Sequence, residues 1–132
     1  MAESLSIRVR RSQLGRVRGS GSAKAGVHHW YAERVTSVAL IPLTLWFVFI
    51  MVRLAGASQE TVVVWAGRPW NTVLLLALIA MTFQHMAQGI QVVLEDYVHE
   101  KWAMTAGVLA TKAACGLLAL LAALSVLKLA LW

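Results

Sequence analysis

Three stretches of mostly apolar residues, separated by short polar segments, dominate the sequence. They cover residues 35–53, 71–94 and 104–130. An α-helix rises 1.5 Å per residue, so about 20 residues are needed to cross the hydrocarbon of a bilayer. The pattern predicts an all-α integral membrane protein with three transmembrane helices, contained in one anchor domain over residues 27–132.

The polar segments between and before these runs predict connections and a tail. Residues 53–69 read as a hydrophilic connection that ends in a Gly-Arg-Pro breaker, and residues 95–102 as a short charged turn. Residues 1–26 are rich in arginine and contain a Gly-Ser-Gly-Ser stretch, which predicts a flexible basic tail with little order before about Ala23. An arginine-rich, acid-poor start is also typical of a mitochondrial transit peptide. We prefer a mobile tail at the membrane surface.

Composition explains why lipid must cover this chain. Of its 132 residues, 59% are hydrophobic, and the mean hydropathy is +0.68. A soluble domain this small buries too little of its surface to hide so many apolar side chains. The net charge of +6 comes mainly from residues ahead of the first run, which favours a membrane surface over nucleic acid as partner. The single cysteine, Cys115, rules out a disulfide framework within the chain.

The distribution of Lys and Arg predicts the orientation in the membrane. Seven of these residues precede the first run, and the connections and the C-terminus carry far fewer. Because basic segments stay on the cytoplasmic side, the N-terminus is expected inside, in the cytoplasm or the mitochondrial matrix. Three crossings then place residues 95–102 inside and the C-terminus outside. Lys112 and Lys128, near the two ends of the third run, are expected to reach the headgroups.

His85 is the one histidine deep within a predicted span. It precedes Asp96 by eleven residues, which places it about 16 Å from the inner interface, near the bilayer midplane. His85, Gly89, Val92 and Asp96 form one stripe along the helix. Intramembrane ionisable groups usually serve a function. An axial haem ligand, with Gly89 leaving room for the macrocycle, accounts for both residues.

Two alternatives limit this interpretation of His85. A neutral histidine bonded to a neighbouring helix needs no haem, and Gly89 also suits plain helix packing. The remaining histidines, His28, His29 and His99, are all expected at the inner surface. A second axial imidazole would therefore have to come from a partner chain.

Further candidate groups gather at the inner ends of the spans. A phenol beside a carboxylate, as in Tyr97 and Asp96, can donate a hydrogen bond to a quinone carbonyl and relay protons. The competing role is interfacial anchoring by Tyr97. Arg34, at the start of the first span, suits haem propionates, although it also serves as a topology-setting charge. His28 lies beside it in the sequence, and no role follows from the pattern for His29 or Trp30.

These residues resemble the D-type hydrophobic membrane-anchor subunit of succinate dehydrogenase (complex II), a cytochrome b556-type anchor. The resemblance rests on Gly26-Val27-His28…Arg34 and on His85-x3-Gly89-x6-Asp96-Tyr97-Val98, and covers about residues 26–131. The companion C-type anchor carries a Ser-Pro-His type segment, and this chain contains no Ser-Pro.

The resemblance implies a subunit of succinate:ubiquinone oxidoreductase that is not catalytic on its own. It implies haem b held by His85 and shared with a C-type anchor, and ubiquinone bound by Tyr97 with support from Asp96. Arg34, His28 and Gly89 would lie near the haem propionates or the quinone pocket. FAD and iron–sulfur clusters would belong to the flavoprotein and iron–sulfur partners, and this chain has neither a glycine-rich fingerprint nor a cysteine cluster.

The expected location is a bacterial inner membrane, in preference to the mitochondrial inner membrane. Two other functions stay open at this point. One is the cytochrome b anchor of a fumarate reductase, which works in the opposite direction. The other is a small non-redox membrane protein, such as an assembly factor or a structural subunit.

Overall fold

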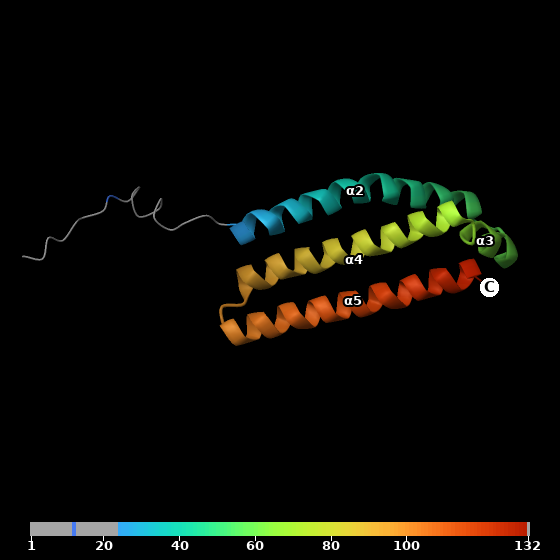
Figure 1. Ribbon diagram of the computed structural model, residues 1–132. Coiled ribbons are helices and arrows are strands. Elements are labelled where there is room, and N and C mark those ends of the chain that lie inside the picture. The colour runs from blue at the N-terminus through green and yellow to red at the C-terminus, as the bar shows by residue number, and fades with distance from the viewer. Residues whose placement is uncertain (1–11, 13–23, 132) are drawn as a thin grey trace, which may run out of the picture.

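Three long helices lie side by side in the computed structural model, which describes residue 12 and residues 24–131. Helix α2 spans Lys24–Leu54, α4 spans Pro69–Tyr97 and α5 spans Lys101–Leu131. Helix α4 lies between α2 and α5, and the short helix α3, Gln59–Ala66, lies at the end where the C-terminus lies (Figure 1). All three long helices are long and apolar enough to cross a membrane. The described part of the chain is all-helical, which confirms the predicted fold class.

The helices extend beyond the predicted spans. Each long helix continues past the apolar run into polar residues at one or both ends, because a helix that crosses the hydrocarbon also passes through the headgroup layers. Residues 24–26, which we assigned to the flexible tail, already belong to α2. The rest of that predicted tail, apart from Ser12, lies outside the described residues. The hydrophilic connection over residues 53–69 contains helix α3, which the sequence pattern did not predict.

We call the end of the bundle where α2 begins, α4 ends and α5 begins the N-terminal end. The turn there is only three residues long, 98–100, so α4 and α5 are antiparallel neighbours. The orientation of this end toward the inside of the cell stays a prediction from the charge distribution.

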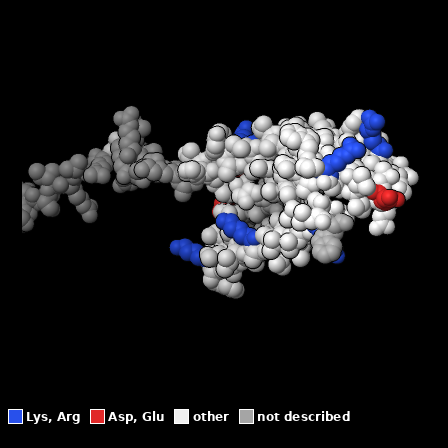
Figure 2. Space-filling view, turned by 45° about the vertical axis from the view of Figure 1, so that its right-hand side comes forward, with Lys and Arg blue, Asp and Glu red and all other residues white. Residues whose placement is uncertain are grey.

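Little of the bundle is buried within this chain. In the apolar windows of the three helices, at most 11% of the residues are buried. Large apolar side chains such as Val38, Leu45 and Leu121 are more than half exposed. The face seen in Figure 2 is correspondingly almost free of charged side chains between the two ends of the bundle. Such a surface has to be covered by lipid or by another apolar chain.

The corner between α3 and α4 is held by side chains that satisfy backbone carbonyls. The Thr72 hydroxyl donates to the Ala66 carbonyl at 2.8 Å, and the Asn71 amide donates to the Trp65 carbonyl at 2.7 Å. Ser58 caps α3 by accepting from the backbone N–H of Thr61. These bonds matter because a carbonyl at a helix end has no partner within the helix.

Two glycines allow α5 to approach its neighbours closely. A Cβ on Gly67 would lie 3.3 Å from the Val63 carbonyl oxygen and 3.4 Å from that of Leu129. A Cβ on Gly107 would lie 3.3 Å from a methyl group of Leu94. Small residues at helix contacts are the usual means of close packing in membranes, where lipid offers no hydrophobic driving force.

We expect Thr72→Val to destabilise the bundle. The substitution keeps the shape of the side chain but leaves the Ala66 carbonyl without its donor, which costs about 1–2 kcal/mol at a buried site. Thr105→Val is the matched control, because Thr105 is exposed and donates only to the Lys101 carbonyl in its own helix. Thermal unfolding in detergent measures both. Equal midpoints for the two variants would show that the α3–α4 corner contributes nothing specific.

Candidate functional site

His85 is held by a hydrogen bond from α4 to α2. Its Nδ1 lies 3.1 Å from the hydroxyl oxygen of Thr36. Thr36 is buried, with 7% of its surface exposed, although it stands in an otherwise apolar run. The bond joins two residues that are 49 positions apart in the sequence. It therefore fixes both the ring of His85 and the relative position of the two helices.

The partners of Thr36 favour one placement of the proton in this contact. Its hydroxyl also lies 3.0 Å from the carbonyl oxygens of Ala32 and Glu33, which can only accept, and 3.4 Å from Oε1 of Gln88. When the single hydroxyl proton is donated to the backbone, the hydroxyl oxygen accepts from Nδ1 of His85, and Nε2 carries the free lone pair.

His85 also lines an open groove between α2 and α4. This groove has a volume of about 410 Å³ and is lined, besides His85, by Ser37, Leu40, Ile41, Thr44 and Leu45. Nε2 of His85 makes no hydrogen bond within the described part of the chain. The groove is mostly apolar and faces outward, so whatever covers it lies against His85.

Gly89 leaves the space one turn along α4 empty. A Cβ built on Gly89 meets no atom within 4 Å. Packing within this chain therefore gives no reason for a glycine at this position, in contrast to Gly67 and Gly107. The space at Gly89 is open, and the notch beside His85 stays a prediction.

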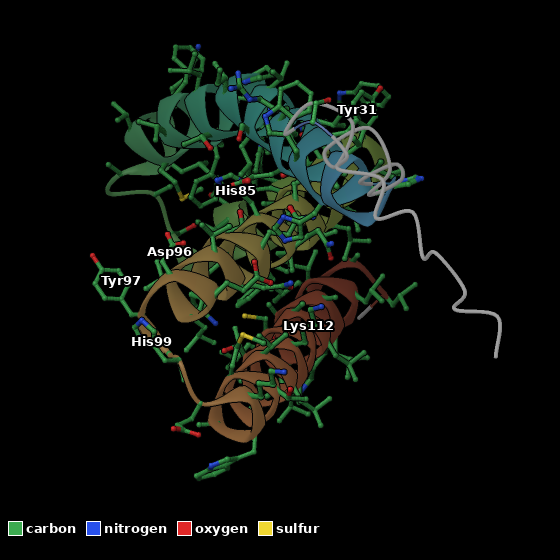
Figure 3. All side chains as sticks on the ribbon, turned by 90° about the vertical axis from the view of Figure 1, so that its left-hand side faces the viewer. Tyr31, His85, Asp96, Tyr97, His99 and Lys112 are labelled. Carbon is green, nitrogen blue, oxygen red and sulfur yellow. The ribbon has the colours of Figure 1, made fainter. Side chains whose placement is uncertain are left out.

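His85 also lies where the sequence predicted, near the middle of the membrane-spanning length. It stands two residues from the centre of the 29-residue helix α4, a displacement of about 3 Å along the axis. Figure 3 looks along the bundle from its N-terminal end and shows His85 between α2 and α4.

Two further polar side chains of α4, Gln88 and Gln91, lie between His85 and the N-terminal end of the bundle. Gln88 is buried, with 6% exposure, and its Oε1 lies 3.4 Å from the Thr36 hydroxyl. The side-chain amide of Gln91 donates to a carboxylate oxygen of Glu95 at 2.7 Å. Neither Thr36 nor these glutamines were predicted from the sequence as site residues. One feature of the sequence could have indicated Thr36: it follows His29 by seven residues, which places both side chains on one side of α2.

Asp96 and Tyr97 form the end of α4 and are open to the surroundings. Asp96 is exposed, and Tyr97 keeps 78% of its surface exposed. In Figure 3 the two side chains lie on the side of α4 away from Lys112, with Tyr97 projecting outward beside His99. Both are available to a ligand or a partner chain, since neither is hydrogen-bonded to another described residue.

Arg34 and His28 are not brought together with Asp96 and Tyr97 by this chain alone. Arg34 is exposed and its guanidinium lies 5.1 Å from the centre of the Trp30 ring, a cation–π contact. His28 is exposed on α2. No hydrogen bond or ion pair within residues 24–131 connects either residue to the end of α4. The candidate groups predicted at the inner ends of the spans are therefore separate within this chain, and a partner would have to bring them together.

No metal-binding cluster exists within the described residues. Nowhere in this part of the chain do three His, Cys, Asp or Glu side chains come close enough to hold a metal ion. His85 can contribute one imidazole to an iron, and any further ligand has to come from outside this chain.

Comparison with known proteins identifies relatives of this chain. Residues 8–125 match the family of succinate dehydrogenase/fumarate reductase transmembrane subunits. The succinate dehydrogenase hydrophobic membrane anchor subunit of Rickettsia bellii is 33% identical over 90 residues, which cover 67% of this chain and 70% of the relative. The subunit of the same name from Paracoccus denitrificans is 33% identical over 79 residues, or 60% and 61% of the two chains. No solved structure matches the chain significantly.

We expect Thr36→Val to release the tautomer of His85. Valine has the shape of threonine but cannot accept the Nδ1 proton, so the ring is free to carry its proton on either nitrogen. Nitrogen-15 NMR of histidine-labelled protein in nanodiscs distinguishes the two tautomers. Thr36→Ser keeps the hydroxyl and should retain the protonated Nδ1. An unchanged His85 spectrum in Thr36→Val would contradict the assigned hydrogen bond.

Proposed function

Because the chain belongs to the family of succinate dehydrogenase/fumarate reductase transmembrane subunits, we propose that it anchors a succinate:ubiquinone oxidoreductase in the membrane. It is a non-catalytic subunit of such a complex, and the oxidation of succinate takes place on other chains. The matched relatives are named for succinate dehydrogenase, which favours this direction over fumarate reduction and over a non-redox assembly role.

The proposal includes haem b, with His85 as one axial ligand. The observation that carries it is the hydrogen bond between Thr36 and Nδ1 of His85, which leaves Nε2 without a partner among the described residues, at a residue that also lines an open groove. Histidines that bind a metal usually donate their other N–H to a neighbouring acceptor, which fixes the ring and strengthens the ligand. The space beside Gly89 supports the same assignment.

The alternative of a purely structural histidine explains only half of these contacts. A His85 that served helix packing would need the bond to Thr36 but not the groove, and no contact within the chain requires the glycine at position 89. A bound haem supplies one-electron chemistry in the middle of the membrane. The residues of this chain hold it on one side, and the second imidazole comes from the C-type anchor.

The exposed pair Asp96 and Tyr97 is proposed as this chain's share of the ubiquinone site. The Tyr97 phenol donates a hydrogen bond to a quinone carbonyl, and the Asp96 carboxylate beside it accepts and passes on protons. Both are exposed at the N-terminal end of the bundle. With that end inside, they face the side on which the iron–sulfur and flavoprotein subunits dock.

Arg34 and His28 are proposed to meet this site only in the assembled complex. Both are exposed in the first third of α2, in the half of the bundle that is nearer to Tyr97. A guanidinium pairs readily with two carboxylate oxygens, so Arg34 suits a haem propionate. The complex would lie in a bacterial inner membrane, in keeping with bacterial relatives.

We expect His85→Ala to abolish the haem signal of the purified complex while the subunits still assemble. An optical spectrum of the reduced wild-type complex should show b-type bands, and the variant should lack them because one axial ligand is gone. Wild-type complex without b-type bands would remove the haem proposal.

Gly89→Ala should lower haem occupancy or shift its spectrum by filling the notch. Within this chain the added methyl meets nothing, so the helix itself should gain up to about 1 kcal/mol from alanine's higher helix propensity. Gly116→Ala is the control, because it is equally free of contacts and lies on α5. Identical haem spectra in both variants would show that Gly89 does not adjoin the haem.

Tyr97→Phe should lower quinone reductase activity by about tenfold or more, because the donor to the quinone carbonyl is lost. The chain contains one other tyrosine, Tyr31, which is exposed on α2, so Tyr31→Phe is the matched control. Succinate oxidation measured with a soluble artificial acceptor should stay normal in both variants. Full quinone reductase activity in Tyr97→Phe would remove this residue from the site.

A further inference from the structure

Two buried polar atoms within residues 24–131 lack a hydrogen-bond partner. They are Nε2 of His29 on α2 and Oε1 of Gln91 on α4. An unpaired polar atom in a protein interior costs about 1–3 kcal/mol, so such atoms usually indicate a bound water or ligand. In a membrane protein no bulk water is present at the hydrocarbon level to relieve this cost.

Both residues line the same two cavities. The first, which we call the mouth cavity, has a volume of about 550 Å³ and lies at the N-terminal end of the bundle. Its lining is Gly26, His29, Trp30, Glu33, Gln91, Val92 and Glu95. The second, the deep cavity, has a volume of about 610 Å³ and extends along α4 between α2 and α5. His29 and Gln91 are the two residues shared by both linings.

The deep cavity changes from polar to apolar along its length. Its polar lining is His29, Gln84, Gln88, Gln91 and Lys112, and its apolar lining includes Ala80 and Ala119. Lys112 was expected to reach the headgroups from near one end of its span. It stands eleven residues after the start of α5, about 16 Å along the axis, and lines this cavity. An ionisable residue at such depth normally faces a polar or water-filled space.

The polar part of the deep cavity leads to the pair formed by Thr36 and His85. Gln88 lines the cavity, and its Oε1 lies 3.4 Å from the Thr36 hydroxyl. That hydroxyl in turn lies 3.1 Å from Nδ1 of His85. Polar groups therefore line the two cavities from the carboxylates of the mouth cavity to the pair near the middle of the membrane.

We propose that the two cavities form one water-filled passage from the N-terminal end of the bundle to Gln88, Thr36 and His85. Where the two cavities meet, at His29 and Gln91, water donates a hydrogen bond to Oε1 of Gln91 and forms another with Nε2 of His29. One water takes up about 30 Å³ in the liquid, so each cavity has room for a chain of several molecules. The passage lets water from that side of the membrane reach the cluster around His85.

The charged groups along the passage support water rather than an anionic lipid as its occupant. Glu33 and Glu95 both line the mouth cavity, where they repel a phosphate or a carboxylate headgroup. Lys112 is the cation that lines the deep cavity, facing His29 and the glutamines across it. The passage is separate from the exposed pair Asp96 and Tyr97, which line neither cavity.

Cysteine accessibility in the assembled complex tests this passage. In a Cys115→Ala background, Gln88→Cys should react with a cationic, membrane-impermeant methanethiosulfonate added on the N-terminal side of the bundle. Ile90→Cys is the control at nearly the same depth, because Ile90 is 39% exposed and lines neither cavity. We expect Gln88→Cys to react at least about tenfold faster, since the reactive thiolate forms only where water reaches it.

The route is tested by narrowing the junction. His29→Phe should slow the labelling of Gln88→Cys to the rate of Ile90→Cys, whereas His99→Phe, in the exposed turn after α4, should leave it unchanged. Equal rates for the two cysteines, labelling from the opposite face, or labelling insensitive to His29→Phe would each overturn the passage.

This inference stands apart from the proposed haem. Labelling reports the water-filled space, and the optical spectrum of the same preparations reports the haem. Fast labelling without b-type bands would keep the passage and remove the haem, and b-type bands with unreactive Gln88→Cys would do the reverse.

Discussion

The hydrogen bond between Thr36 and His85 is the contact on which the arrangement of this bundle depends. It stands near the middle of the bundle, where lipid offers no alternative partner for an imidazole. It joins α2 to α4, and the same hydroxyl lies 3.4 Å from Oε1 of Gln88 on α4. When the Thr36 proton is donated to the backbone, its oxygen accepts from Nδ1 of His85. The same hydroxyl group therefore contributes both to helix packing and to the environment of His85.

The surface of the bundle is that of one part of a larger assembly. Its helices bury few residues against one another, and large apolar side chains remain exposed along all three spans. The groove beside His85 is open and the end of α4 is exposed, so groups from outside this chain are needed to cover both. Membership in a family of transmembrane subunits gives this incompleteness a reason, since such a chain is one subunit of a larger complex.

Much of this could be predicted from the sequence, because lipid imposes simple rules. Three apolar runs of sufficient length give three helices, and the spacing from His85 to Asp96 gives the depth of the histidine. The helix in the first connection was missed, since its eight residues are too few for a clear period and depend on the Ser58 cap. Thr36 was missed because its importance arises from a contact across 49 residues, which no local pattern contains.

The polar half of α4 illustrates what the sequence could and could not convey. Three glutamines in a span signal that this face avoids lipid. In the structure, Gln88 and Gln91 meet Thr36 and Glu95 within the same chain and line a cavity between α2 and α5. His85 lines the open groove between α2 and α4 instead. A single helix therefore faces two environments: a mostly apolar groove beside His85, and a polar cavity in which Oε1 of Gln91 has no partner among the described residues. Since Thr36 touches both His85 and Gln88, it is the one residue through which the two sides of α4 communicate.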